Sequence, residues 1–122
     1  MNALGLFLLT AFALSCAPSK VLVTPRPPPM PADLEPQFSS AILSRKLEFQ
    51  SCAEAHRRSV GTEPAKIVMA FVIETSGQVR DAHQVGGVEQ PALAACLAAA
   101  LETMVVTPPP AAAAPIFFPF KY

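Results

Sequence analysis

The positions of its prolines limit the structures that this chain can form more than any other feature of the sequence. Fourteen of its 122 residues are proline, and seven of these fall between Ala17 and Pro36. Because proline fixes the backbone angle φ and lacks an N–H, this density favours extended polyproline II over packed structure. We interpret residues 16–36 as a tether, reaching roughly 60 Å at about 3.1 Å per residue, rather than as a ligand for an SH3-type domain. One small domain follows over residues 37–122.

An uncharged apolar run from Leu4 to Leu14 precedes the tether. Crossing a bilayer core takes about 20 helical residues, so the run is too short to span a membrane and is typical of a signal peptide. It ends in Ala13-Leu14-Ser15-Cys16, which resembles the site where bacterial lipoprotein precursors are cleaved. We expect residues 1–15 to be a lipoprotein signal peptide and Cys16 to carry lipid. Cleavage near Ser15 without lipidation is the alternative.

Two further cysteines, Cys52 and Cys96, remain in a chain expected to reach an oxidising compartment. Cysteine pairs there are normally bridged, so a disulfide is the simple interpretation and two buried thiols are the alternative. A bridge closing about 45 residues would stabilise the fold by roughly 4 kcal/mol. Neither His56 nor His83 has the spacing from a cysteine that zinc sites use, so we expect no metal and no cofactor.

Helical and strand-like patterns alternate along the domain. Apolar residues recur at helical spacing over residues 38–56 and again over 91–104. Residues 66–74 and 79–85 are strand-like and flank turn residues, which predicts a hairpin. An aromatic strand over 116–122 closes the chain, and because its internal proline cannot donate to a ladder, we expect this strand at a sheet edge.

This order of helix, strand, strand, helix, strand predicts an α+β fold. The second helix returns the chain so that the last strand lies antiparallel beside the first, giving a three-stranded antiparallel sheet of order 2-1-3. Two helices then cover one face, with Cys52 and Cys96 between them. Val68, Ala70 and Val72 form an apolar row on the other face. This row could support a homodimer, which we keep as an alternative.

The charges exclude some classes of function. Nine Lys and Arg residues balance nine Asp and Glu residues, and they are scattered, so the chain has no electrostatic footprint for nucleic acid. No carboxylates form a paired motif, and His83 has no nucleophile or carboxylate at a known spacing. We therefore expect no nucleic-acid partner and no enzymatic activity. The alternative is a small periplasmic enzyme or metal-binding protein that uses His83, His56 and free thiols.

Four short stretches carry a family resemblance. They are Phe49-Gln50-Ser51-Cys52, the hairpin from Lys66 to Ile73 with Ser76-Gly77-Gln78-Val79, the helix start from Pro91 to Cys96, and Phe118-Pro119-Phe120. In this order they resemble the AgmX/PglI C-terminal domain, over about Ile42 to Tyr122. That family is similar to a TonB C-terminal domain with two cysteines, and is associated with myxobacterial and related envelopes, including gliding machinery. The resemblance implies a TonB C-terminal-like fold.

The resemblance also implies a function, because TonB-like domains bind partner segments by adding a strand at a sheet edge. The edge strand here carries Ile116, Phe117, Phe118, Phe120 and Tyr122, which we take as the candidate partner-binding residues. Aromatic residues also dominate small cores, so a core role for the three phenylalanines is the alternative.

The expected location follows from the signal peptide and from the residue after Cys16. Ala17 after Cys16 resembles sorting of a lipoprotein to the outer membrane. We therefore expect a noncatalytic lipoprotein that is held in the periplasm at the outer membrane by its lipid. Its TonB-like domain would dock an envelope protein or peptide.

Overall fold

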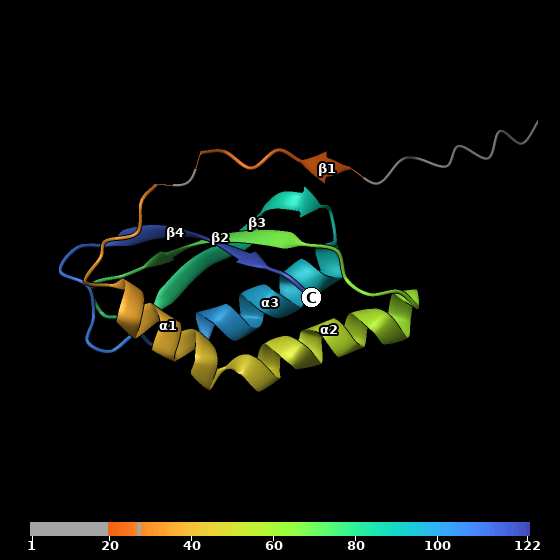
Figure 1. Ribbon diagram of the computed structural model, residues 1–122. Helices are drawn as coiled ribbons and strands as arrows, with labels where there is room; N and C mark the ends of the chain where they lie inside the picture. The colour runs from red at the N-terminus through yellow and green to blue at the C-terminus, as the bar shows by residue number, and fades with distance from the viewer. Residues whose placement is uncertain (1–19, 27) are drawn as a thin grey trace, which may run out of the picture.

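The computed structural model describes residues 20–26 and 28–122, so Cys16 and the expected signal peptide lie outside the described residues. The fold is α+β, with three helices on one face of a four-stranded antiparallel sheet (Figure 1). The strands are β1 (Val21–Leu22), β2 (Ile67–Ile73), β3 (Val79–Val88) and β4 (Ala114–Phe120). The helices are α1 (Glu35–Ser44), α2 (Lys46–Val60) and α3 (Pro91–Glu102).

The sheet has the strand order β1-β3-β2-β4. Strands β3, β2 and β4 therefore lie in the order predicted from the sequence, but the prediction of three strands was wrong. The fourth strand, β1, pairs Val21 with Val88 and Leu22 with Gly87, inside the segment expected to be a free tether. Its two residues are too few to show a strand pattern, and their pairing depends on a distant partner strand.

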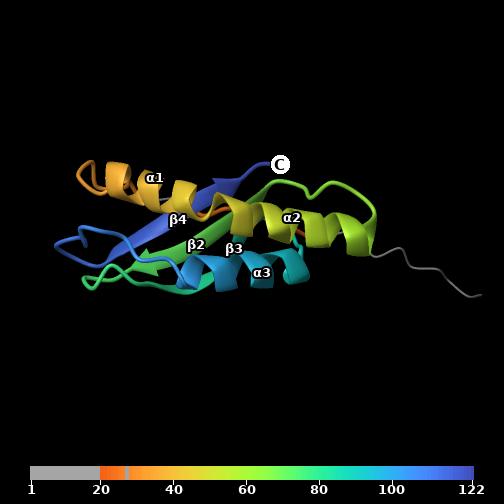
Figure 2. The same cartoon turned by 90° about the horizontal axis from the view of Figure 1, so that it is seen from below.

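The inner face of β2 forms the centre of the core. Ile67, Met69, Phe71 and Ile73 are all buried and face the helix layer, where α3 contributes residues spaced by one helical turn. Those α3 residues are Leu93, Leu97 and Leu101. Helix α3 begins at Pro91, as predicted, because the missing proline N–H costs no hydrogen bond in a first helical turn. Figure 2 shows α3 beside α2, with α1 extending along β4.

The outer face of the sheet is also covered. The chain between β1 and α1 runs along this side, opposite the helices (Figure 1). A Cβ atom at Gly86 would collide with the side-chain oxygen of Thr24. Val68 and Ala70 are only 8% and 5% exposed. Of the apolar row that could support a homodimer, Val68 and Ala70 are therefore covered within the chain, and Val72 is partly exposed.

Strand β3 extends past its predicted end at Val85. Gly86 and Gly87 continue the strand to Val88, although their composition indicates a break. Gly86 fits because Thr24 lies against it and leaves no room for a side chain. The glycine pair is thus part of the sheet where β1 joins it.

The single helix predicted over 38–56 is two helices that meet at Arg45, whose φ of −108° and ψ of 11° are not helical. The guanidinium of Arg45 donates to the carbonyl oxygen of Thr103 at 3.0 Å and to Glu48 at 2.7 Å. The break therefore accompanies a tertiary contact, which no local pattern could indicate. Helix α2 also runs past His56 to Val60 and ends at Gly61, whose φ of 81° suits glycine at a helix C-terminus.

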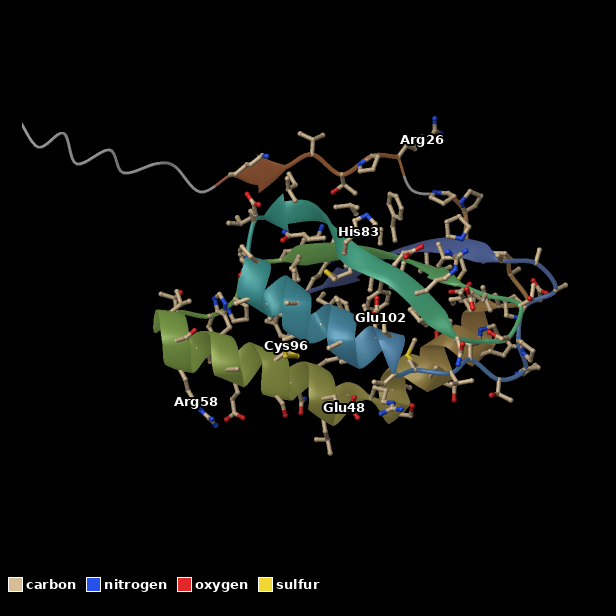
Figure 3. The ribbon with its side chains drawn as sticks, turned by 180° about the vertical axis from the view of Figure 1, so that it is seen from behind. Arg26, Glu48, Arg58, His83, Cys96 and Glu102 are labelled. Carbon is tan, nitrogen blue, oxygen red and sulfur yellow. A yellow bond between two sulfur atoms is a disulfide. The ribbon has the colours of Figure 1, made fainter. Side chains whose placement is uncertain are left out.

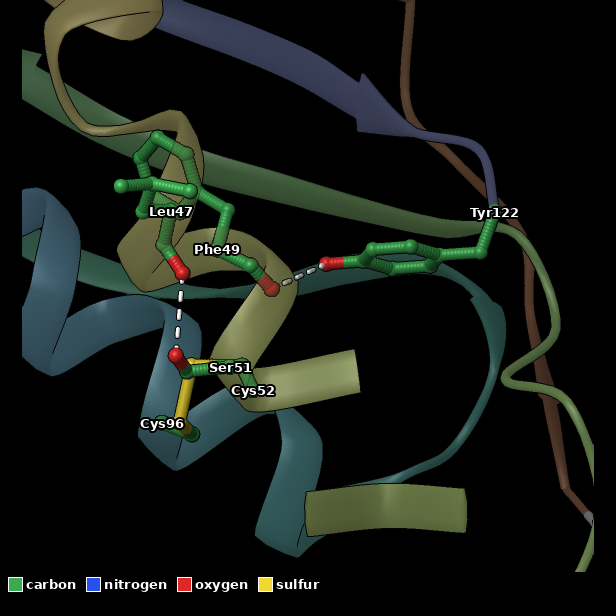
Figure 4. Close-up of a disulfide and its surroundings, with 6 residues drawn as sticks. All are labelled: Leu47, Phe49, Ser51, Cys52, Cys96 and Tyr122. Carbon is green, nitrogen blue, oxygen red and sulfur yellow. Dashed lines mark hydrogen bonds between the residues drawn. A yellow bond between two sulfur atoms is a disulfide. The ribbon is translucent and has the colours of Figure 1, made fainter. Parts of the chain in front are cut away.

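A disulfide between Cys52 and Cys96 links α2 to α3 (Figure 4). The two Cα atoms are 5.7 Å apart, within the usual range for a bridge. Cys52 is buried, and Cys96 is partly exposed. The disulfide holds α2 against α3. Helix α2 depends on this link because only three of its fifteen residues, Phe49, Cys52 and Ala53, are buried.

Candidate docking site at the edge of the sheet

Strand β4 lies at one edge of the sheet, next to β2. The seven residues from Ala114 to Phe120 pair in continuous antiparallel register with Ile73 to Ile67. The edge position expected from Pro119 is what the structure shows. Tyr122, however, lies two residues beyond the end of the strand.

The candidate binding residues of β4 divide between the two faces. Ile116 and Phe120 are buried on the inner face, where the Phe120 ring lies 5.1 Å from the ring of Phe49. Phe118 is partly buried on the same face, with its ring 5.0 Å from that of Phe120. Phe117 points to the outer face and is also partly buried. Ile116 and Phe120 therefore serve the core, and Phe117 and Phe118 keep some exposed surface.

The backbone groups on the free side of β4 follow from its prolines. Pro115, Phe117 and Pro119 are alternate residues of the strand, so their backbone groups point to the same side. A proline within a sheet is accommodated where its nitrogen faces away from the ladder. The backbone N and C=O groups of these three residues therefore point away from β2, and the N–H and C=O groups of the residues between them bond to β2. The free edge then offers three carbonyl acceptors but only one N–H donor, that of Phe117.

This imbalance limits what can pair with β4. Two β4 edges placed together would align six acceptors with two donors, so the edge is poorly suited to pairing with a second copy of itself. Prolines on exposed edges protect against such association in many sheets. A partner strand with an ordinary backbone can still donate to all three carbonyls and accept from Phe117.

A groove of about 570 Å³ runs between β4 and the junction of α1 and α2. Its apolar lining comes from both sides of the groove: Ile42, Leu43, Phe49, Phe118, Pro119, Phe120 and Tyr122. Leu43 is 69% exposed, and Leu47, one turn further along, is 78% exposed. Lys46 and Lys121 also line the groove, together with Gln50. An exposed sheet edge and an apolar groove are thus adjacent.

Tyr122 is one of the residues that line this groove, and its side chain is partly covered. Its hydroxyl donates to the carbonyl oxygen of Phe49 at 3.4 Å (Figure 4). Burial raises the pKa of Tyr122 to about 12, and the nearby positive charge of Arg57 opposes part of that rise. Arg57 itself forms an ion pair with Glu63 at 2.8 Å, and this hydrogen bond raises the pKa of the guanidinium.

Sequence patterns alone missed the helical side of the groove. Within one continuous helix, Leu43 and Leu47 would flank the buried stripe, and nothing marks them as exposed. In the structure the helix is interrupted at Arg45, and both Leu43 and Leu47 are exposed to solvent instead of packing in the core. Lys46 was likewise not distinguishable from the other charged residues of a solvated helix face.

Of the two histidines of the alternative enzyme or metal site, His56 lies near the cysteines and His83 does not. His56 lines a small cavity of about 120 Å³ together with Cys52 and Cys96. His83 opposes Ala70 in the sheet and so lies on the outer face, whereas Cys96 lies in the helix layer (Figure 3). His56 lines a cavity of about 370 Å³ beside the start of α3, with Glu63 and Glu89. Both sulfurs are committed to the disulfide, so this candidate site has no free thiol.

Metal-ligating residues do not gather in groups of three or more within residues 20–26 and 28–122. None of the helices in that part of the chain is long and apolar enough to cross a bilayer. No protein-family model, curated protein or solved structure matched the chain.

Proposed function

We propose that this chain is a noncatalytic cell-envelope lipoprotein whose domain docks an extended segment of a partner protein along β4. One observation carries the proposal. The open edge of β4 lies directly beside an apolar groove, so a single bound strand could use both.

Strand addition explains why both features are needed. The backbone of an added strand would bond to the carbonyls of Pro115, Phe117 and Pro119 and to the N–H of Phe117. Its alternate side chains would point toward the helix side, where the groove contains Leu43 and Phe118. Backbone bonds give such complexes affinity, and pockets for alternate side chains give them selectivity.

The envelope location rests on three features. Cys16 follows a leader that resembles a lipoprotein signal peptide, and the disulfide between Cys52 and Cys96 is of the kind that persists in oxidising compartments. The order of elements from α2 to β4 agrees with kinship to the AgmX/PglI C-terminal domain and its TonB-like fold. We therefore place the protein in the periplasm, anchored by lipid at the outer membrane.

A crosslinking experiment in the native host tests the docking site. A photoreactive amino acid at Leu43, in the groove, should crosslink a discrete partner, whereas the same group at the exposed Arg58 should not. Introducing Phe117→Pro should abolish the crosslink because it removes the only outward N–H of β4. Phe117→Ala removes the side chain but keeps the N–H, so it should leave the crosslink in place.

Two results would contradict the proposal. The first is an equal crosslink from the positions of Leu43 and Arg58. The second is a crosslink from Leu43 that survives in a folded Phe117→Pro variant. Far-UV circular dichroism establishes folding, and Leu43→Asp provides a second disruption that leaves β4 intact.

A further inference from the structure

We propose that the segment bound in the groove is acidic as well as apolar, with carboxylates that pair with Lys46 and Lys121. This inference rests on the docking function proposed above and adds the chemistry of the partner. The groove is the surface where exposed apolar side chains, an open sheet edge and unmatched positive charge meet.

The charged side chains of the groove have one sign. Of its ten lining residues, Lys46 and Lys121 are the charged ones, and no carboxylate side chain lines it. Within the described residues, neither lysine forms an ion pair. The nearest acidic residue along α2, Glu48, is already bound to Arg45 at 2.7 Å. The lysines are therefore available to a partner.

A bound strand that covers the groove would make the charges of Lys46 and Lys121 affect the binding affinity. An apolar strand laid over Leu43 and Phe118 would remove water from the neighbouring ammonium groups. Desolvating a charge without a partner is costly, whereas a carboxylate on the bound strand would offset that cost. An acidic segment should therefore bind more tightly than a basic one, and added salt should reduce the difference.

A peptide suits this site better than an anionic lipid. A lipid could place an acyl chain on the apolar lining and a phosphate near the lysines. It would leave the outward carbonyls of β4 without hydrogen-bond donors, whereas a peptide backbone supplies N–H groups at the strand spacing. The volume of about 570 Å³ is within the range of sites that bind small ligands and short segments.

The test uses the disulfide-bonded mature chain with Cys16→Ser and three fluorescein-labelled peptides. Each peptide has the core Val-Leu-Val, flanked on both sides by pairs of Glu, Gln or Lys. We expect the Glu peptide to bind about tenfold more tightly than the Lys peptide in fluorescence anisotropy at low salt. A Lys46→Glu, Lys121→Glu variant should invert this preference. A control variant with Lys20→Glu and Arg26→Glu, at exposed positions that do not line the groove, carries the same change in net charge and should keep the wild-type preference.

Three results would overturn the inference, and they differ in what they leave standing. If all three peptides bind alike and Phe117→Pro weakens each, docking at β4 stands and the acidic partner is refuted. If no peptide binds, both proposals fail. If phosphatidylglycerol vesicles bind through Lys46 and Lys121 while the peptides do not displace them, the groove is a lipid site.

Discussion

Removing the disulfide should destabilise this domain severely. The bridge joins Cys52 to Cys96, which are 44 residues apart. In the chain-entropy model, closing a loop of that length removes unfolded-state entropy worth about 4 kcal/mol at 25 °C. Small domains have total stabilities of about 5–15 kcal/mol, so the loss would be a large share. Helix α2 should suffer most, because it buries only three residues.

Chemical denaturation followed by circular dichroism measures this loss. The Cys52→Ala, Cys96→Ala variant should unfold with a free energy about 4 kcal/mol lower than the oxidised protein, and with a Tm roughly 15–30 °C lower. Each single variant should cost nearly as much as the double, because either one removes the whole bridge.

A reducing agent provides the control for that experiment. It should lower the stability of the wild-type protein toward that of the double variant and leave the double variant unchanged. A loss below about 1 kcal/mol in the double variant would refute the argument that this bridge restricts the unfolded chain. Because α2 forms one wall of the groove, reduction should also weaken peptide binding.

Three further predictions concern single residues. Tyr122 is the only tyrosine in a chain without tryptophan, so its ionisation can be followed by absorbance. The midpoint should lie above 10, toward about 12, because the side chain is partly desolvated, and a midpoint near 10 in the folded protein would show that the hydroxyl stays fully hydrated. Since the pKa of Tyr122 is raised by folding, its contribution to stability should be complete below about pH 10 and decline as the pH rises toward 12. Gly86→Ala should displace Thr24 and β1 from the sheet, seen as faster amide exchange at Glu89, whose N–H donates to Lys20; unchanged exchange there would argue against the contact. Leu97→Ala should cost about 2–5 kcal/mol of unfolding free energy because Leu97 is fully buried, and a smaller cost would mean that the core collapses around the gap.

The parts of the fold that could be predicted are those with strong local patterns. The one-turn spacing of Leu93, Leu97 and Leu101 after Pro91 indicates α3. Apolar side chains on both faces of β2 indicate a central strand. Pro119 indicates the sheet edge, because its missing N–H excludes an interior position. The disulfide is predicted from the number of cysteines together with the expectation of an oxidising compartment.

The remaining features depend on contacts between distant residues. The break at Arg45 accompanies a hydrogen bond to Thr103, which lies 58 residues away. Strand β1 has two residues and exists through its pairing with Val88 and Gly87. The groove needs both the break and the edge strand, so its two lysines could not be distinguished from other surface charges before the fold was known.

Amide exchange at Phe117 tests the central claim most directly. In the free protein this N–H should exchange rapidly, while the neighbouring N–H groups of Ile116 and Phe118 are protected by bonds to β2. Binding of the Glu-flanked peptide should slow exchange at Phe117 by at least about tenfold, because the amide then donates to the added strand. Unchanged exchange at Phe117 under saturating peptide would contradict docking by strand addition at β4.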